Sequence, residues 1–156
     1  MLSQRCKYAL KAMVDLARAS GGPRRVSDIA EQENIPRKFL EAIMTDLKKG
    51  LVVDSTRGKF GGYRLSRPSD LITFGEIIRL IDGPLALLPC ASQNFYRPCD
   101  DCEDEITCVL RRVLIDARNE LAAVLDRTTL AAALAAPPQS QFAAAILAED
   151  SPIPVG

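Results

Sequence analysis

Apolar side chains recur at helical spacing in three short segments near the start of the chain. The first covers residues 3–19, and the second covers residues 27–33, with Ser27 as its expected capping residue. Pro36 suits the first position of a third helix, which Gly50 ends. Its expected inward face consists of Phe39, Leu40, Ile43, Met44 and Leu47. The second and third segments, joined by a brief turn, predict a helix-turn-helix.

A β-hairpin is predicted directly after the third helix. Residues 51–56 read as a short strand, RGKFGG at 57–62 is a glycine-rich turn, and a returning strand begins at Tyr63. This order of elements is that of a winged helix, which predicts a mainly α fold with a small β-hairpin wing and double-stranded DNA as a partner. The expected contacts are Arg37, Lys38 and Glu41 near base edges, and Arg57, Lys59 and Arg64 along the DNA backbone or minor groove.

The rest of the chain predicts a short helix, an irregular stretch and a long helix. Thr73 and Glu76 form a capping box for the short helix, which ends at Gly83. From Ile106 an apolar stripe continues to Leu125, longer than one small domain is expected to cover. A second copy of the chain is the simplest cover, and burial against the first helix of the same chain is the alternative.

These patterns divide the chain into four parts. We expect a winged-helix DNA-binding domain at residues 1–83, a cysteine-rich sensor loop at 84–105, a dimerisation helix at 106–130, and a tail at 131–156 that is disordered. The formal net charge of zero hides a division between the halves, since residues 1–83 hold 15 Lys and Arg against 10 Asp and Glu, and residues 84–156 hold 5 against 10. The basic excess therefore lies on the segment expected to meet DNA.

Composition also restricts the class of protein. The chain contains no histidine, which excludes Ser-His and Cys-His catalysis and histidine metal ligands. No other catalytic constellation is visible, so we do not expect an enzyme. No apolar run is long enough for a membrane span, and the first residues lack the apolar core of a signal peptide. We therefore expect a cytoplasmic protein without a membrane partner.

Four of the five cysteines lie within one short segment, at Cys90, Cys99, Cys102 and Cys108. Four thiols so close together in an intracellular chain indicate ligation of a metal or cluster. A structural zinc ion is an alternative, because Cys-x-x-Cys pairs are common zinc clamps. A thioredoxin-like redox motif is disfavoured, since the run DDCEDE at 100–105 surrounds the thiols with negative charge.

Several motifs together resemble the IscR, NsrR and BadM family of regulators, also written the Rrf-two family. They are KYALKAMVDLA at 7–17, IPRKFLEAIMTDLKKGLV at 35–52, STRGKFGGYRLSRP at 55–68, and ITFGEIIRLIDG at 72–83 followed by a cysteine loop and a long helix. The resemblance covers about residues 1–130. It implies a homodimeric winged-helix regulator, a partly palindromic operator, and in many members a 2Fe-2S or 4Fe-4S cluster whose state tunes DNA affinity. On this basis we expect a transcriptional regulator, a repressor, that senses iron-sulfur, redox or iron status.

The cysteine pattern departs from the one that the resemblance implies. The common family pattern has three loop cysteines and a fourth ligand from elsewhere in the dimer, and here Cys90, Cys102 and Cys108 match that pattern while Cys99 is additional. Cys6 lies on the first helix, from which some relatives supply a ligand. We favour the local set of four, because it avoids ordering a distant segment, and we expect Cys6 to be a small buried residue. A zinc-stabilised winged-helix or interaction protein and a cluster-free thiol-based regulator remain as alternatives.

Overall fold

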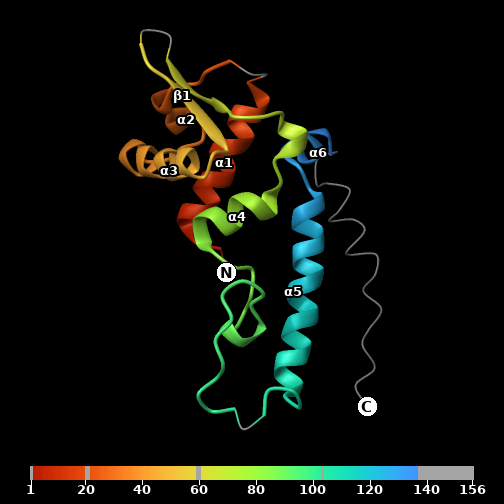
Figure 1. Cartoon of the computed structure of the whole chain (residues 1–156). Coiled ribbons are helices and arrows are strands. Elements are labelled where there is room, and N and C mark those ends of the chain that lie inside the picture. Colours follow the sequence, from red (N-terminus) through yellow and green to blue (C-terminus); the bar gives the residue numbers. More distant parts are fainter. Residues whose placement is uncertain (1, 20–21, 59–60, 103, 137–156) are drawn as a thin grey trace, which may run out of the picture.

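The computed structural model describes residues 2–19, 22–58, 61–102 and 104–136 of the 156-residue chain. Four helices and a hairpin form a compact unit at one end of the molecule, which we call the head (Figure 1). The helices are α1 (Gln4–Arg18), α2 (Val26–Gln32), α3 (Arg37–Lys49) and α4 (Phe74–Asp82), and the strands are β1 (Val53–Thr56) and β2 (Gly62–Leu65). The mainly helical winged-helix fold is thereby confirmed.

The core of the head is formed by the apolar faces that the sequence pattern predicts. Met13 and Leu16 of α1 pack with four fully buried residues of α3, and Ile77 of α4 closes the same cluster. The four residues of α3 are Leu40, Ile43, Met44 and Leu47. This packing fixes one side of α3 and leaves its opposite side at the surface.

The hairpin is antiparallel, with Val53 opposite Leu65 and Thr56 opposite Gly62. A backbone bridge extends it on the other side, because the backbone groups of Arg24 and Tyr63 exchange two hydrogen bonds of 2.8 Å. Gly62 permits this approach, since a Cβ atom there would lie 2.4 Å from the carbonyl oxygen of Arg24. The wing is thus attached to the segment between α1 and α2.

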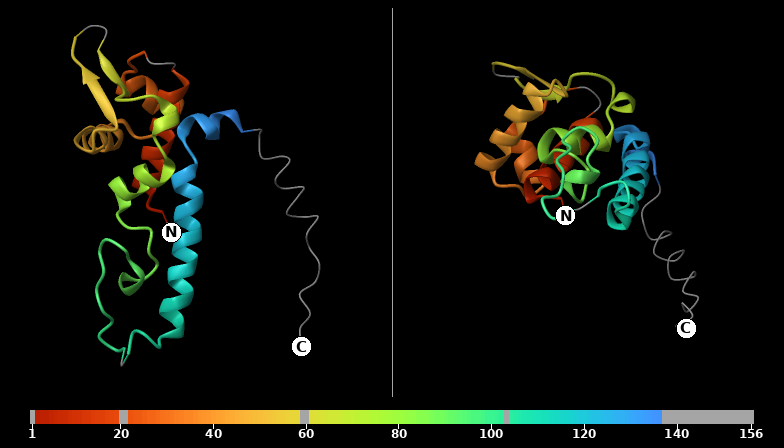
Figure 2. Two further views of the ribbon diagram at one scale, coloured as in Figure 1. Left: turned by 45° about the vertical axis from the view of Figure 1, so that its right-hand side comes forward. Right: turned by 60° about the horizontal axis from the view of Figure 1, so that its bottom comes forward.

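A long helix connects the head with an irregular loop at the far end of the molecule. Helix α5 (Val109–Arg127) runs beside the loop of residues 83–108, which contains the short 3-10 turn η2 (Pro89–Ala91). Figures 1 and 2 show the wing and the loop at opposite ends, with α5 reaching from the loop up to the head. Another 3-10 turn, η1 (Ser69–Leu71), and the last helix, α6 (Leu130–Ala135), lie together at the side of the head.

The start of the predicted disordered tail is helical, because residues 131–135 belong to α6, and the long helix predicted over 106–130 ends at Arg127. Leu130 is fully buried, its backbone nitrogen donates to the carbonyl of Ile72 over 2.9 Å, and Thr129 caps α6. These contacts join segments far apart in the sequence, which explains why local composition missed them. Residues 137–156, the remainder of the predicted tail, lie outside the described residues.

Three further local predictions are wrong. Helix α2 begins at Val26 with Arg25 at its cap position, and the Ser27 hydroxyl donates to Asp28 instead of capping. Phe39 is 43% exposed and meets the Tyr8 ring edge-on, so it is not a core residue. Strand β1 starts at Val53 because Leu51 has a φ of 59° in a turn. The Thr73 cap of α4 is confirmed, with the Glu76 backbone nitrogen donating to its hydroxyl.

Among the described residues, no helix combines the length and apolar character that crossing a bilayer requires.

Candidate functional site

The exposed side of α3 presents the three residues expected to meet base edges. Arg37, Lys38 and Glu41 are all exposed near the start of the helix, while the opposite side is buried in the core. The Arg37 Nε donates to a Glu41 carboxylate oxygen over 3.0 Å, one helical turn away. Because both side chains are exposed, this ion pair contributes little to stability, and the guanidinium stays at the surface of α3. The side of α3 that the structure leaves free is therefore the polar one predicted from sequence.

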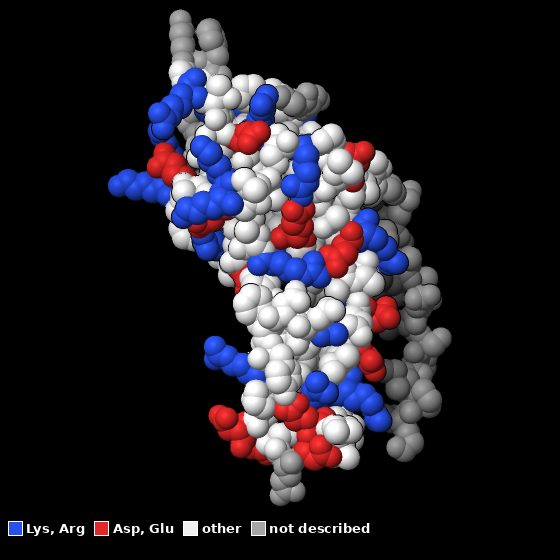
Figure 3. Space-filling view, in the orientation of Figure 1, with Lys and Arg blue, Asp and Glu red and all other residues white. Residues whose placement is uncertain are grey.

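The wing carries its cations next to this helix. Arg57 is exposed at the hairpin turn, and Arg64 lies opposite Asp54, with their charged groups 4.0 Å apart. Lys59, the third predicted wing contact, lies outside the described residues. In Figure 3 Lys and Arg side chains are visible over the head together with several Asp and Glu, and a group of Asp and Glu side chains lies at the far end, over the loop. The acidic run of the second half of the sequence is thus also an acidic cluster in space.

A groove of about 320 Å³ separates the start of α3 from the wing. Its lining includes Arg37 and Glu41 from α3, and also Arg25, Ser27 and Tyr63. The last three were not predicted as site residues. In the sequence, only the Arg24-Arg25 pair directly before a helix hints at such a role. The packing of α2 beside the wing is what brings Arg25 to the same surface as α3.

A buried ion pair anchors the wing to α1. Asp15 is only 2% exposed, and both of its carboxylate oxygens accept hydrogen bonds of 3.1 Å from Arg24. Hydrogen bonding to Asp15 raises the pKa of the Arg24 guanidinium, which therefore stays charged. Because the backbone of the same arginine pairs with Tyr63, the position of the wing depends on this contact.

The four clustered cysteines lie together at the end of the molecule opposite the wing. Cys90 is buried in η2, Cys99 and Cys102 are half-buried in the loop, and Cys108 caps α5 by accepting from the Arg111 backbone nitrogen at 3.4 Å. The helix expected from Ile106 begins at Val109 instead, which puts Cys108 at the cap position directly before its first turn. A thiol at a helix N-terminus lies where the helix dipole favours negative charge.

Side-chain contacts join these cysteines into two pairs. Hydrogen bonding with Cys90, followed by burial and the nearby charges of Cys90, Cys102 and Asp101, raises the pKa of the Cys99 thiol to about 11. A hydrogen bond with Cys108 is the main cause that raises the pKa of Cys102, and the charge of Cys90 also contributes. The Cys90–Cys99 and Cys102–Cys108 pairs therefore interact with each other as well as internally. Repulsion between such thiolates is what a bound cation relieves.

Arg111 holds the loop against α5. Its Nε donates to the backbone carbonyl of Cys90 over 3.0 Å and lies 3.9 Å from a carboxylate oxygen of Glu105. Its guanidinium carbon also lies 6.0 Å from the centre of the Tyr96 ring, and the Tyr96 hydroxyl donates to Glu105. One side chain of α5 therefore contacts segments on both sides of Cys99 and Cys102. Sequence spacing gave no sign of this role.

Four thiols are chemically suitable ligands for a metal ion or cluster. In this structure, however, they lie as two pairs and do not surround a common centre. Within the described part of the chain, no three or more Cys, Asp or Glu side chains have the arrangement of a metal site. Cys6 lies apart from the four, fully buried beside the end of α4, where burial and then Asp82 raise its pKa to about 11. As predicted from its apolar face, it is a small core residue in this single chain.

Among the described residues, nothing in the same chain covers the apolar stripe of α5. No residue of α5 is buried, and Val109, Leu110, Val113, Leu121 and Val124 are between 44% and 63% exposed. Its contacts in the same chain are with α4 and η2, not along α1. A row of exposed apolar side chains on one helix is typical of an interface. The alternative that α1 covers this face is not what the structure shows.

An ion pair connects α5 with the head. The guanidinium of Arg79 on α4 binds the carboxylate of Asp126 near the end of α5, with one of its two hydrogen bonds measuring 2.9 Å. This hydrogen bonding lowers the pKa of Asp126. The backbone nitrogen of Phe74 also donates to the carbonyl of Thr128 over 3.0 Å. The C-terminal end of α5 is thus fixed to α4, while its N-terminal end holds the cysteine loop.

Comparisons with known proteins agree on one family. Residues 2–136 match the Rrf2 family, described as an iron-dependent transcriptional regulator. An rrf2-like HTH-type transcriptional regulator of Rhodobacter capsulatus is 42% identical over 140 residues, 87% of this chain and 93% of the relative. The structure of CymR, the global cysteine regulator of B. subtilis, is similar with a TM-score of 0.70 and 32% identity, over 85% of this chain and 94% of that one. The structure of T. potens IscR has a TM-score of 0.66 and 28% identity, over 100% and 93% respectively.

Proposed function

The chain belongs to the Rrf2 family of transcriptional regulators, and we propose that it acts as a homodimeric repressor whose DNA affinity depends on an iron-sulfur cluster held by Cys90, Cys99, Cys102 and Cys108. The single observation that carries this proposal is that the four cysteines lie in one loop, in which Arg111 of α5 bonds both the Cys90 carbonyl and the Cys108 sulfur. Soft, deprotonated sulfur is the ligand that iron-sulfur clusters require, and four sulfurs complete the set. When bound, the cluster supplies a redox-active centre whose charge depends on its state.

The DNA-binding half of the proposal rests on the exposed polar face of α3 and the basic wing. Arg37, Lys38 and Glu41 would meet base edges in a major groove, and Arg57, Lys59 and Arg64 would meet the backbone or minor groove. Arg25 joins this set because it lines the groove between α3 and the wing. A dimer formed through α5 would place two such surfaces on a partly palindromic operator.

The connection between the two ends runs along α5. Arg111 and Arg118 bind the backbone carbonyls of Cys90 and Ala91 at its N-terminal half, and Asp126 binds Arg79 of α4 at its C-terminal end. Rearrangement of the loop would therefore shift α5 relative to the head and change the spacing of the two heads in the dimer. A small change in spacing is sufficient to lose the register with two half-sites.

Two alternatives to an iron-sulfur cluster would use the same four cysteines. Zinc also accepts four thiolates, and it would hold the loop in one arrangement without a redox response. A cluster-free thiol regulator would instead use the contacts within the Cys90–Cys99 and Cys102–Cys108 pairs, and the similarity to a global cysteine regulator favours testing it. In that case each pair forms a disulfide and passes two protons and two electrons to a peroxide.

Anaerobic purification followed by iron, sulfide and zinc analysis separates these possibilities. We expect visible absorption bands with iron and sulfide, lost in each of Cys90→Ser, Cys99→Ser, Cys102→Ser and Cys108→Ser and retained in Cys6→Ser. Cys6→Ser is the matched control, because this thiol lies outside the loop. A colourless protein with stoichiometric zinc would establish the zinc alternative. Full cluster content in Cys99→Ser together with loss in Cys6→Ser would show that the fourth ligand comes from α1.

A further inference from the structure

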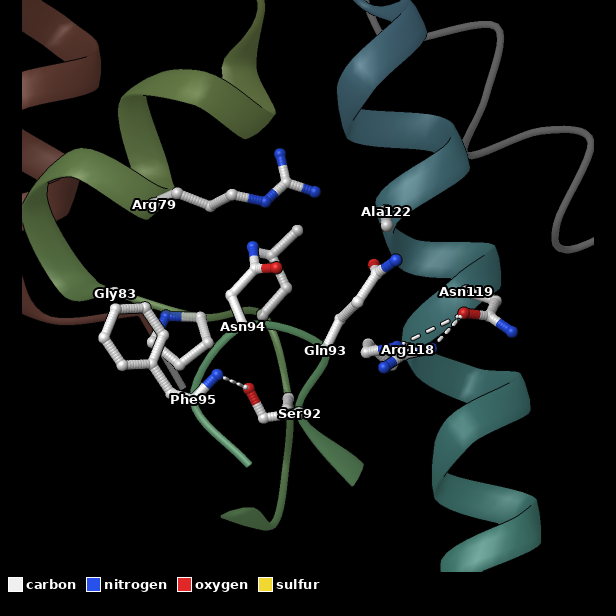
Figure 4. A pocket seen from close by; sticks show the side chains of 12 residues that line it. Arg79, Gly83, Ser92, Gln93, Asn94, Phe95, Arg118, Asn119 and Ala122 are labelled. Carbon is white, nitrogen blue, oxygen red and sulfur yellow. Dashed lines mark hydrogen bonds between the residues drawn. The ribbon is translucent and has the colours of Figure 1, made fainter. Parts of the chain in front are cut away.

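A cavity of about 110 Å³ lies where the end of α4, the start of the loop and the middle of α5 meet. Figure 4 shows Arg79 reaching from α4 towards α5 above Gln93 and Asn94 of the loop, with Arg118 and Asn119 on the α5 side. None of the four clustered cysteines lines it, and neither do the predicted DNA contacts. Of its lining, the proposed function uses the contacts of Arg79 with Asp126 and of Arg118 with Ala91, and it gives no role to the space between them.

The cavity carries an unbalanced positive charge. Two guanidiniums line it, and that of Arg79 is neutralised by the carboxylate of Asp126. Within the described part of the chain, the acceptors of Arg118 are all neutral, since it donates to the Ala91 carbonyl over 2.7 Å and to the Asn119 side-chain oxygen over 2.6 and 3.2 Å. No Asp or Glu is among the described residues that line the cavity. A half-buried guanidinium without a counter-charge favours an anion.

The remaining lining mixes polar and apolar side chains. Gln93, Asn94 and Asn119 contribute side-chain amides, and Leu85, Phe95 and Ala122 contribute apolar atoms. Apolar side chains together with a few polar groups that fix the orientation of a ligand are the usual composition of a small-molecule site. With about 30 Å³ for each water molecule, the cavity holds the equivalent of about four waters. This volume suits an anion with a short carbon body.

We propose that this cavity binds a small organic carboxylate, with its carboxylate group at Arg118 and its carbon atoms against Leu85, Phe95 and Ala122. A carboxylate matches the planar fork of donors that a guanidinium presents. An inorganic oxoanion would also bind the positive charge of Arg118, but it would leave the apolar side chains of the cavity in contact with water. The occupant is therefore an organic acid of few heavy atoms.

Such a ligand would act on the same connection as the cysteine loop. It contacts α5 through Arg118, the loop through Gln93 and Asn94, and α4 through Arg79, so it would favour the arrangement in which these three elements are close. A ligand that prefers one arrangement changes the DNA affinity by its difference in affinity for the two arrangements. The site would thus give the regulator a second input, from a metabolite.

The proposal is tested by titrating the full-length protein, as purified, with acetate and with pyruvate at constant ionic strength. Binding is followed by the chemical shifts of the backbone amides in NMR spectra. Acetamide is the uncharged matched probe, and sulfate is the inorganic one. We expect saturable shifts centred on Gln93, Asn94 and Asn119 with both carboxylates and none with acetamide. Arg118→Gln should weaken binding about ten-fold or more, because it removes a charge-assisted hydrogen bond. Arg112→Gln, on an exposed position of α5 outside the cavity, should bind as the wild type does.

Ala122→Leu provides a second variant that leaves Arg118 in place. The longer side chain should fill the apolar side of the cavity and weaken carboxylate binding, whatever Arg118→Gln does to the loop. The proposal is overturned by an absence of saturable shifts with both carboxylates, by equal binding in the wild type and both cavity variants, or by tighter binding of sulfate than of either carboxylate. All three outcomes leave the iron and sulfide analysis of the cysteine loop unaffected.

Discussion

At the scale of single residues, Arg111 shows how one side chain organises a loop that has little regular structure. It binds the Cys90 carbonyl, lies beside Glu105 and Tyr96, and belongs to the first turn of α5, which Cys108 caps. Its guanidinium is also a fixed positive charge at the backbone of Cys90. Residues of this kind orient metal ligands and tune the bound group without touching it.

Arg111→Gln should therefore weaken the loop without removing any thiol. We expect iron loss to a chelator to become about ten-fold faster, because the loss of a supporting contact commonly costs ten-fold or more in metal affinity. In the metal-free protein, the Cys90 thiol should also react faster with a thiol reagent, since its backbone is no longer held to α5. Arg112→Gln is the matched control on the same turn. If Arg111→Gln matches the control in both measurements, Arg111 does not position the loop.

At the scale of elements, the wing depends on a contact outside the hairpin. Arg24 pairs its backbone with Tyr63 and its side chain with the buried Asp15, so α1 determines where the wing stands relative to α3. The wing cation Arg57, in contrast, is exposed, and within the described residues it has no comparable anchoring contact. The two arginines should therefore affect DNA binding in different ways.

Salt dependence distinguishes these two roles. Arg57→Ala should lower operator affinity and reduce the slope of log affinity against log salt by about one, because one phosphate contact is lost. Arg24→Met should lower affinity with the slope unchanged and should reduce the free energy of unfolding by about 2 kcal/mol, since Asp15 keeps a buried charge without a partner. A reduced slope in Arg24→Met with normal stability would identify Arg24 as a DNA contact instead.

The elements that sequence predicted well are those determined by neighbouring residues. The apolar face of α3, the Thr73 cap and the glycine-rich hairpin all follow from local spacing, and the structure contains each of them. The misses at Phe39 and at the start of the predicted tail depend on contacts between distant segments, such as the bond from Leu130 to Ile72. Ser27 is a different case, because its hydroxyl donates to the neighbouring Asp28 and the helix begins one residue earlier. For the same reason, spacing indicated which cysteines cluster but did not reveal the two pairs or Arg111.

At the scale of the whole molecule, the account requires two chains, because α5 exposes an apolar stripe and a regulator of a palindromic site needs two heads. Replacing Val113 and Leu121 by Glu should place two charges in the interface and yield monomers at micromolar concentration. Sedimentation velocity measures this directly. Arg112→Glu combined with Ala123→Glu adds the same residues at exposed positions away from the stripe and should leave the dimer intact. If the Val113→Glu, Leu121→Glu double variant is still a dimer, the interface does not lie on this stripe.

The central claim is that the state of the cysteine loop controls DNA binding at the other end of the molecule. Its most direct test begins with an operator that the protein selects from random DNA. The affinity of one preparation for this operator is then measured at fixed salt, before and after removal of the cluster. We predict at least a ten-fold difference between the two states, within the usual range for coupled sites, and none in a variant with serine at all four loop cysteines. Equal affinity in the loaded, unloaded and four-serine proteins would contradict the account.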